Sequence, residues 1–339
     1  MANDLLKSKL ISNDKIELLV NGNEYAEAAK LLLKLQLMRW ELLSENYKNL
    51  NFVKIKSYDY GSFRINLQYN PARIKSTTAG SEKAIEHNSK CILCYENLPA
   101  EQKAIIILDS FLILCNPFPI FPAHFTIAKI KHRPQEIESS FNDLLLLSKF
   151  LHKHYTVVYN GPKCGASEPE HLHFQAGTKQ FMPIENEFSS LQNEFGEIIF
   201  DNDSLTISAV DDGLRKFISF ESSNDIALLN SFNQFYKIYK NIQIRNREPM
   251  MNIICNYEVE SGWRVIVFLR SKHRSKHYFD DDVLLSPAVV DLGGVCVTPE
   301  EKDFNRINRL LLKEILSEVS LYKEGFEYII SSMKDNISF

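Results

Sequence analysis

Two short apolar runs on either side of a polar turn constrain the fold of this chain most. Ala104–Leu108 and Phe111–Cys115 flank Asp109-Ser110, and this pattern predicts a hairpin in a buried sheet. Phe125–Ile130 predicts a further strand of the same antiparallel core. No apolar run approaches the ~20 residues that a helix needs to cross a bilayer, so we expect no membrane span.

Helical patterns surround these strands. Residues 1–50 are predicted to form an N-terminal helical extension, because Glu24–Leu43 contains no Gly or Pro and is rich in good helix formers. The order of elements indicates an α+β fold rather than repeated βαβ units. The other elements predicted in the first half are a strand over Phe63–Tyr69, an exposed polar loop over Ser76–Asn88, a helix over Glu136–Tyr155, and strands over Thr156–Tyr159 and His171–Ala176.

The second half repeats this kind of pattern. Leu112-Ile-Leu-Cys-Asn116 is similar to Asn252-Ile-Ile-Cys-Asn256, which indicates a duplication unless the similarity is due to chance. We therefore divide the chain into an N-terminal extension (1–50), a first half (51–197) and a second half (198–339). The elements predicted in the second half are strands over Leu205–Ala209, Lys216–Glu221, Asn252–Asn256 and Arg264–Leu269, a helix over Ile226–Tyr239, and helices after Pro299.

Charge and cysteine content narrow the function classes. Lys and Arg number 39 against 43 Asp and Glu, a formal net charge of -4, so no global positive field exists to hold nucleic acid. The first residues lack the charged and apolar regions of a signal peptide, which favours the cytoplasm. Six cysteines do not make a disulfide scaffold in a chain of this length.

A row of alternating polar and apolar residues carries the sharpest chemical signal. On a strand, His171, His173 and Gln175 share one face at roughly 6–7 Å steps. A face of this kind can simply be solvated. The preceding loop favours a site, because Gly165 and Ser167 allow backbone N–H groups and a hydroxyl to approach an anion such as phosphate.

His173, at the centre of this row, suits a nucleophile. A neutral imidazole attacks phosphorus when one ring nitrogen donates to a carbonyl group and the other keeps its lone pair. Gln175 has no titratable proton, so it can orient phosphoryl oxygens without acting as a general acid. The two residues together favour group transfer over hydrolysis.

Cys91-Ile-Leu-Cys94 has the spacing of a zinc half-site. A tetrahedral site needs two more ligands, for which His132 and His171 are the candidates. A redox pair and two buried free thiols are alternative interpretations of the same motif. In the zinc interpretation, the metal fixes the end of the strand that carries His173.

These motifs resemble those of a known family. The polar row, preceded by Asn160-Gly161 and the small-residue loop, is similar to the His-x-His-x-Gln signature of the transferase branch of the histidine-triad superfamily. That branch contains galactose-1-phosphate uridylyltransferase, diadenosine tetraphosphate phosphorylase and GDP-hexose phosphorylase. The resemblance extends over about residues 70–177, and more faintly to about residue 304. It implies duplicated histidine-triad-like halves, with antiparallel sheets flanked by helices.

The resemblance also implies roles for individual residues. His173 matches the nucleophile that carries the nucleotidyl group, and Gln175 and Ser167 match residues that hold the phosphates. Asn160 resembles a residue that supports the same site. The remaining matches are Asn116 in a segment similar to the sugar-contacting stretch, Asn70 and Arg73 in one similar to a nucleotide-contacting stretch, and Cys91, Cys94, His132 and His171 at the zinc ligands of the uridylyltransferases.

The residue between the two histidines bears on the substrate. The uridylyltransferases have Pro there, whereas Leu172 is closer to the phosphorylases. The resemblance therefore implies a nucleotidyltransferase or phosphorylase that acts on an NDP-sugar, such as a GDP-hexose, or on a dinucleoside polyphosphate. A covalent nucleotidyl-histidine forms, and phosphate or a sugar phosphate accepts the nucleotide. The second half lacks the signature, so one active site per chain is expected.

Several points stay open in the sequence. A non-catalytic nucleotide-binding or regulatory protein and a histidine-triad-like hydrolase are the alternative functions. Base and sugar specificity, oligomeric state and the role of the N-terminal helices are undetermined. A basic cluster after the last predicted strand fits either an acceptor-phosphate site or a solvated turn, and it comprises Arg270, Lys272, His273 and Arg274.

Overall fold

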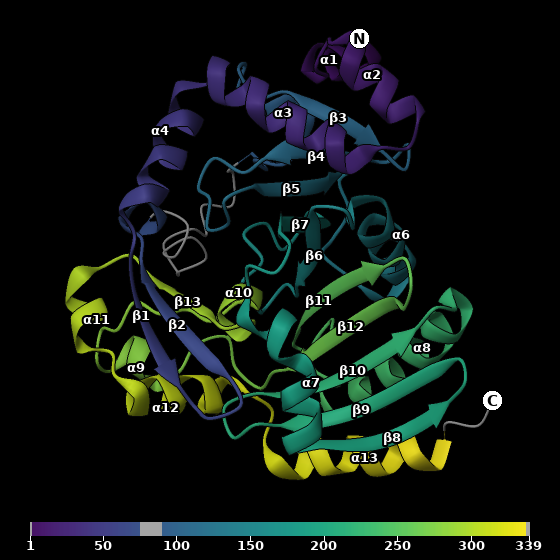
Figure 1. Cartoon of the computed structure of the whole chain (residues 1–339), viewed down its shortest axis with the longest axis vertical. Coiled ribbons are helices and arrows are strands. Elements are labelled where there is room, and N and C mark those ends of the chain that lie inside the picture. Colours follow the sequence, from purple (N-terminus) through teal and green to yellow (C-terminus); the bar gives the residue numbers. More distant parts are fainter. Residues whose placement is uncertain (1, 75–89, 337–339) are drawn as a thin grey trace.

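The computed structural model describes residues 2–74 and 90–336 (Figure 1). The predicted loop over Ser76–Asn88 lies outside these residues. The strands are β1 (Lys54–Asp59), β2 (Arg64–Tyr69), β3 (Ala104–Ile107), β4 (Phe111–Cys115), β5 (His124–Lys129), β6 (Tyr155–Asn160), β7 (His173–Thr178), β8 (Gly196–Asn202), β9 (Leu205–Asp211), β10 (Lys216–Ser222), β11 (Met251–Glu258), β12 (Gly262–Leu269) and β13 (Val295–Thr298).

Helices α1 to α4 precede the first strand, α11 to α13 follow the last one, and the others connect strands. The helices are α1 (Ala2–Lys9), α2 (Asp14–Asn21), α3 (Tyr25–Arg39), α4 (Glu41–Asn49), α6 (Phe141–Leu151), α7 (Pro183–Phe195), α8 (Asp225–Ile242), α9 (Lys276–Phe279), α10 (Val289–Leu292), α11 (Glu301–Arg306), α12 (Arg309–Val319) and α13 (Lys323–Asn336), with short 3-10 turns that include η2 (Pro71–Arg73) and η4 (Tyr95–Asn97).

Within the described ranges the strands form a ten-stranded sheet and a three-stranded sheet. The large sheet has the order β3-β4-β5-β7-β6-β11-β12-β10-β9-β8, so the two halves show the same order when each is read inward from its own edge. They join where β6 pairs antiparallel with β11. This arrangement confirms the predicted α+β fold with duplicated antiparallel halves.

The sequence similarity that first suggested duplication relates the wrong elements. Residues 112–115 lie in β4 and residues 252–256 in β11. The counterpart of β11 in the first half is β6, so this similarity is accidental although the duplication is real. The predicted boundary at residue 198 falls inside β8, and the division of the chain into domains stays a prediction.

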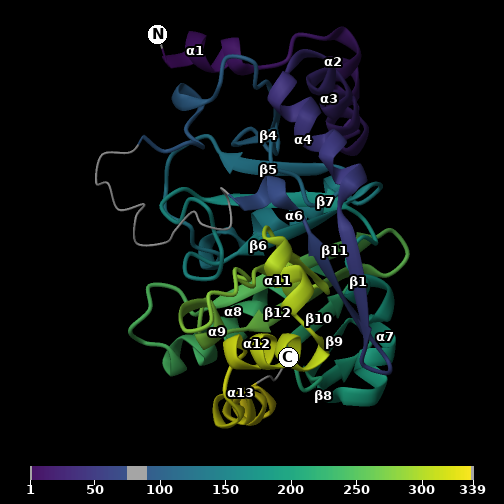
Figure 2. The same cartoon turned by 90° about the vertical axis from the view of Figure 1, so that its left-hand side faces the viewer.

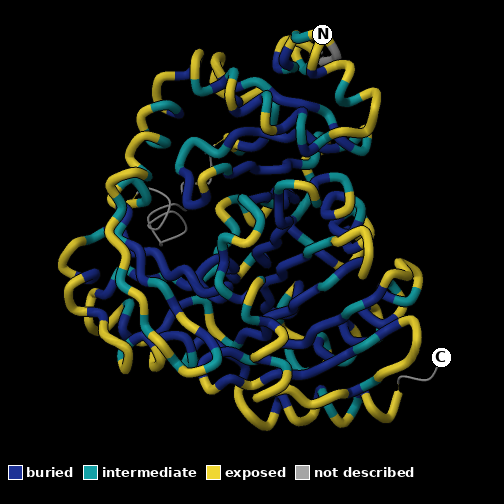
Figure 3. The backbone as a smooth tube through the Cα atoms, viewed as in Figure 1, coloured by how far each residue is buried: buried dark blue, intermediate teal, exposed yellow. Residues whose placement is uncertain are grey.

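Helices cover one face of the large sheet, and the small sheet lies over part of the other (Figures 1 and 2). Helices α3, α6 and α8 contact the large sheet on the helical face, where aromatic and aliphatic side chains from both halves form one continuous core. On the opposite face, residues of β2, β13, α7 and α12 form a second core. The central strands are almost wholly buried, whereas the outer helices alternate between buried and exposed residues (Figure 3).

Several predicted elements differ in their limits. The segment Glu24–Leu43 forms two helices, because Trp40 takes an extended conformation with φ -125° and packs its indole into the core. Strand β7 begins at His173 rather than His171. The helix predicted over Glu136–Tyr155 is the shorter α6. Among the described residues, no helix combines the length and apolarity needed to cross a membrane.

Candidate active site and metal centre

His173 is the first residue of β7 and is 2% exposed. Its Nδ1 lies 2.7 Å from the carbonyl oxygen of His171. Because a carbonyl only accepts, Nδ1 carries the proton and Nε2 keeps its lone pair. Burial lowers the pKa of His173 to about 4, so the ring is neutral near pH 7. This is the form in which an imidazole attacks phosphorus.

Gln175 lies two residues further along β7, and His124 sets its orientation. The Ile120 backbone N–H donates to His124 Nδ1 at 3.2 Å, so the proton of the neutral ring is on Nε2, which donates to Gln175 Oε1 at 3.1 Å. Burial, with a smaller contribution from the charge of Arg73, lowers the pKa of His124 to about 3. Gln175 therefore has its NH2 group available for a phosphoryl oxygen.

No local signal in the sequence marks His124 as part of a site. Its partner lies 51 positions away, and the two residues meet only because β5 and β7 are neighbours in the sheet. The predicted row of three polar residues is also wrong in one respect. Because the strand starts at His173, His171 lies before it and turns toward the two cysteines.

The loop between β6 and β7 is held in place by the second half of the chain. Asn160 Oδ1 accepts hydrogen bonds from Asn252 Nδ2 at 2.7 Å and from the Val289 backbone N–H at 2.9 Å. Gly165 has φ +94°, and a Cβ there would lie 2.7 Å from the Cβ of Ala288. Only glycine fits this tight turn. The second half therefore acts as the support of the predicted phosphate loop.

Arg270 is not part of an exposed basic turn, although it lies close in sequence to Lys272 and Arg274. It is fully buried, and its guanidinium donates to Asn252 Oδ1 at 2.6 Å and to backbone carbonyls that include Pro287 O at 3.0 Å. Lys272 is paired with Glu318 at 2.8 Å. Arg270 is thus neither a solvated turn residue nor turned toward an incoming anion. It fixes Asn252, which in turn holds Asn160.

Asn70, Arg73 and Asn116 meet in the loop that follows β4. Asn70 Nδ2 donates to Pro119 O at 3.3 Å and Arg73 donates to Phe118 O at 2.7 Å. The Asn116 side-chain oxygen accepts from the Phe118 backbone N–H at 2.9 Å. Burial lowers the pKa of Arg73 to about 10, so it remains cationic near pH 7. A local positive charge therefore lies close to His124 and Gln175.

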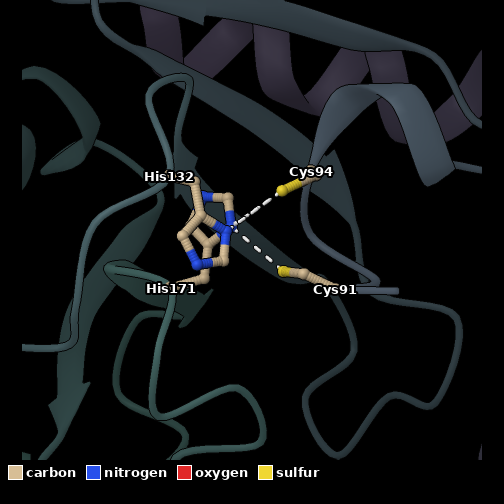
Figure 4. A group of neighbouring side chains, drawn as sticks. All are labelled: Cys91, Cys94, His132 and His171. Carbon is tan, nitrogen blue, oxygen red and sulfur yellow. Dashed lines mark hydrogen bonds between the residues drawn. The ribbon is translucent and has the colours of Figure 1, made fainter. Parts of the chain in front are cut away.

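Cys91, Cys94, His132 and His171 form one cluster (Figure 4). Their ligand atoms all lie within 4.8 Å of one another. Cys91 Sγ is 3.2 Å from His171 Nδ1, and Cys94 Sγ is 3.1 Å from His132 Nδ1. Two sulfurs and two imidazole nitrogens are a donor set that suits tetrahedral zinc. The cluster could therefore hold a metal ion.

The surroundings of the cluster connect it to the predicted site. His171 Nε2 lies 2.6 Å from the Lys129 carbonyl oxygen, the kind of partner that orients a metal-bound histidine. The carbonyl oxygen of Glu168, which follows Ser167, accepts a hydrogen bond from the His171 backbone N–H at 3.0 Å. The end of the predicted phosphate loop and the start of β7 are thus both attached to the cluster.

Buried Glu248 supports the start of the loop between β6 and β7. Glu248 is 2% exposed and accepts hydrogen bonds from the Tyr159 hydroxyl at 2.7 Å and the Ile137 backbone N–H at 2.5 Å. A Cβ on Gly161 would lie 3.3 Å from Glu248 Oε1. Burial raises the pKa of Glu248 to about 8.

Replacing Glu248 with glutamine is expected to change how stability depends on pH. Above about pH 4.5 the unfolded chain loses a proton that folded Glu248 keeps up to about pH 8, so the wild-type protein loses stability over this range. Glu248→Gln lacks the titration, and its stability relative to wild type should rise between pH 5 and pH 8 by roughly 1 kcal/mol or more. Thermal unfolding at both pH values measures this, and a difference that stays constant with pH would contradict it.

Two family models and one relative match parts of the sequence of this chain. A family model described as a domain of unknown function, DUF4922, matches residues 32–178, and one described as the GDPGP1-like C-terminal domain matches residues 189–338. The chain is 28% identical over 149 residues to galactose-1-phosphate uridylyltransferase of Bacillus subtilis (strain 168). This match covers 40% of the chain and 29% of the relative's length.

Solved structures extend the likeness to most of the chain. Yeast Ap4A phosphorylase Apa2 in complex with AMP superposes with a TM-score of 0.53 at 13% identity, over 85% of this chain and 96% of that one. The same enzyme in complex with Ap4A gives a TM-score of 0.51 at 13% identity, over 83% and 96%. At this level of identity the likeness shows the fold alone.

Proposed function

The chain belongs to the histidine-triad-like family of galactose-1-phosphate uridylyltransferases, Ap4A phosphorylases and GDP-hexose phosphorylases, and from this premise we propose that it is a nucleotidyltransferase of the phosphorylase type. The donor is an NDP-sugar, such as a GDP-hexose, or a dinucleoside polyphosphate. The acceptor is inorganic phosphate or a sugar phosphate. One observation carries the proposal: a buried, neutral His173 whose Nδ1 is bonded to a carbonyl beside an oriented Gln175.

The reaction proceeds in two displacements at the α-phosphorus. His173 Nε2 donates its lone pair to phosphorus, an N–P bond forms, and the bond to the bridging oxygen breaks as the sugar phosphate or nucleotide leaves. An oxygen of the acceptor then attacks the same phosphorus, and the N–P bond breaks. The His171 carbonyl stabilises the positive charge that the ring carries in between, because it accepts the Nδ1 proton in a hydrogen bond throughout.

The surrounding side chains bind and orient the phosphates. The Gln175 NH2 group donates to a nonbridging oxygen, and the loop through Gly165 and Ser167 offers backbone N–H groups and a hydroxyl. Arg73 supplies the local positive charge that the chain as a whole lacks, while Asn70 shapes the nucleotide side of the site and Asn116 the sugar side. Gln175 has no proton to give to a leaving group, which favours transfer over hydrolysis.

Zinc is the proposed metal, held by Cys91, Cys94, His132 and His171. When bound, it supplies a structural cross-link rather than chemistry at the substrate. His171 then positions His173 through its carbonyl group, and the Lys129 carbonyl fixes the ring of His171. A thiolate site of this kind suits a reducing compartment such as the cytoplasm.

A panel of donors tests the function. The purified protein is incubated with GDP-, UDP- and ADP-hexoses and with diadenosine tetraphosphate, with and without inorganic phosphate or hexose 1-phosphate, and the products are identified. Phosphate-dependent release of a nucleoside diphosphate is expected. Nucleoside monophosphate formed without phosphate would instead make the chain a hydrolase, and binding without turnover would make it a nucleotide-binding protein.

Replacing His124 with phenylalanine should slow turnover about 10- to 100-fold, the cost of roughly 1–3 kcal/mol for one misdirected hydrogen-bonding group. Without the Nε2–H donor, Gln175 loses the partner that holds its NH2 group toward the substrate. Steady-state rates with the donor identified above measure the effect. His152→Phe, a change at the end of α6, is the matched control. Equal rates for both variants would remove His124 from the site.

A further inference from the structure

Gln135 makes three hydrogen bonds to the backbone of two residues of the proposed site. It is 1% exposed. Its Nε2 donates to the carbonyl oxygens of Asn160 and His173, both at 2.9 Å. Its Oε1 accepts from the His173 backbone N–H at 2.8 Å. A single side-chain amide therefore satisfies both backbone groups of His173 and the carbonyl group of Asn160.

The Gln135 amide lies just beyond the point where the pairing of β6 with β7 ends. Strands β6 and β7 pair from Tyr155 with Thr178 to Val158 with Gln175. Continued in the same register, Asn160 would face His173, but this pair is not part of the ladder. Gln135 lies between the two residues and takes the bonds that they would otherwise make to each other. The strands consequently separate at the point where His173 and the phosphate loop begin.

Gln135 is itself held rigidly. Its backbone N–H donates to the Pro169 carbonyl at 3.1 Å, and the Arg133 carbonyl accepts from the Leu172 N–H at 2.6 Å. Two residues later, the Ile137 N–H is bonded to the buried Glu248. Two backbone hydrogen bonds thus hold this segment beside the residues before β7, and they fix the position of the Gln135 side-chain amide.

We propose that Gln135 is a positioning residue for nucleotidyl transfer, which sets the backbone position of His173 relative to the phosphate loop and so aims Nε2 at the α-phosphorus. This inference rests on the proposed function. The amide makes no bond to the imidazole ring, so it acts only through the backbone of His173 and Asn160. If these hydrogen bonds were lost, the backbone of His173 would shift and turn the ring away from in-line attack. A displacement of about 1 Å costs on the order of 10²-fold in rate.

Two substitutions separate this role from ordinary packing. Gln135→Met keeps the volume and removes all three hydrogen bonds. Gln135→Glu keeps an acceptor for the His173 N–H but places a carboxyl oxygen against the two carbonyl groups. For both variants we expect kcat to fall about 10²-fold, with KM and nucleotide Kd within about threefold of wild type, because the binding groups are retained.

Gln36 provides a matched control. It is also fully buried and joins two backbone groups, because its Oε1 accepts from the Lys103 N–H at 2.8 Å and its Nε2 donates to the Glu101 carbonyl at 3.1 Å. Gln36→Met should lower Tm about as much as Gln135→Met and leave kcat unchanged. A structural role alone would lower Tm in both variants and kcat in neither.

A spectroscopic readout keeps the test independent of turnover. In protein labelled with 15N-histidine, wild-type His173 should show a proton on Nδ1 and slow backbone amide exchange. Gln135→Met removes the acceptor of this amide and should make it exchange at least tenfold faster, whereas Gln36→Met should not. If His173→Ala retains full activity, the proposed function fails, and the exchange data still report on positioning. Unchanged exchange and unchanged kcat in folded Gln135→Met protein, or unchanged kcat in folded Gln135→Glu protein, would overturn the inference.

Discussion

Substituting His173 with alanine is expected to abolish nucleotidyl transfer, with a loss on the order of 10⁴-fold or more in rate. The substitution removes Nε2, the one ring nitrogen that the His171 carbonyl leaves with a lone pair aimed away from the backbone. Binding groups in Gln175, Arg73 and the loop remain, so nucleotide affinity should change only a few-fold. The loss should therefore appear in kcat.

The covalent intermediate gives this prediction a direct measurement. Wild-type protein incubated with donor labelled in its α-phosphate should retain label that is lost in acid and stable in base, as a phosphoramidate bond requires. His173→Ala should retain none, while its circular dichroism and Tm stay close to those of wild type. Equal labelling of the two proteins would exclude His173 as the nucleophile.

Loss of one cysteine of the metal cluster is expected to have the second-largest effect. Cys94→Ser should reduce the zinc content from about one ion per chain to a small fraction, since the sulfur lies 3.1 Å from His132 Nδ1 and 3.7 Å from His171 Nδ1. Because metal binding is linked to folding, Tm should fall by roughly 5 °C or more. Activity should fall as well, since His171 carries the carbonyl that orients His173.

Metal analysis and thermal unfolding, each with and without a chelator, measure these effects. Cys255→Ser is the matched control, because Cys255 is buried and lies outside the cluster, and its thiol donates a hydrogen bond to the Ser148 hydroxyl at 3.2 Å. Zinc content should be unchanged in this variant. A wild-type protein that is metal-free and equally stable with chelator would contradict the zinc proposal.

The sequence predicts those parts of the fold that depend on local pattern. The hairpin of β3 and β4 follows from two apolar runs around a short turn of three residues, in which Leu108 and Asp109 take positive φ angles of 53° and 52°. Strands β1 and β8 escape prediction because they are edge strands with mostly exposed residues, so the apolar signal is weak. The break at Trp40 also has no local signal, since it results from packing of the indole.

The candidate site shows the same difference between residues that belong to a local sequence pattern and residues that are brought together only by the fold. His173, Gln175 and the two cysteines belong to short motifs, and the structure places the first two on β7 and the cysteines beside His132 and His171. Gln135 and His124 belong to no motif. Their roles depend on the register of β5, β6 and β7, which one sequence does not reveal. Hence the proposed reacting groups belong to motifs that the sequence shows, whereas the groups that hold them are found only in the fold.

The join between the two halves has a consequence for synthesis of the protein. As the nascent chain leaves the ribosome, one edge of β6 has no partner until β11 emerges. One edge of β2 likewise has no partner until β13 emerges. Two open, largely buried strand edges are therefore exposed for much of translation, and such edges recruit other chains. Chaperone binding during synthesis should accordingly persist until the residues of β13 have left the exit tunnel.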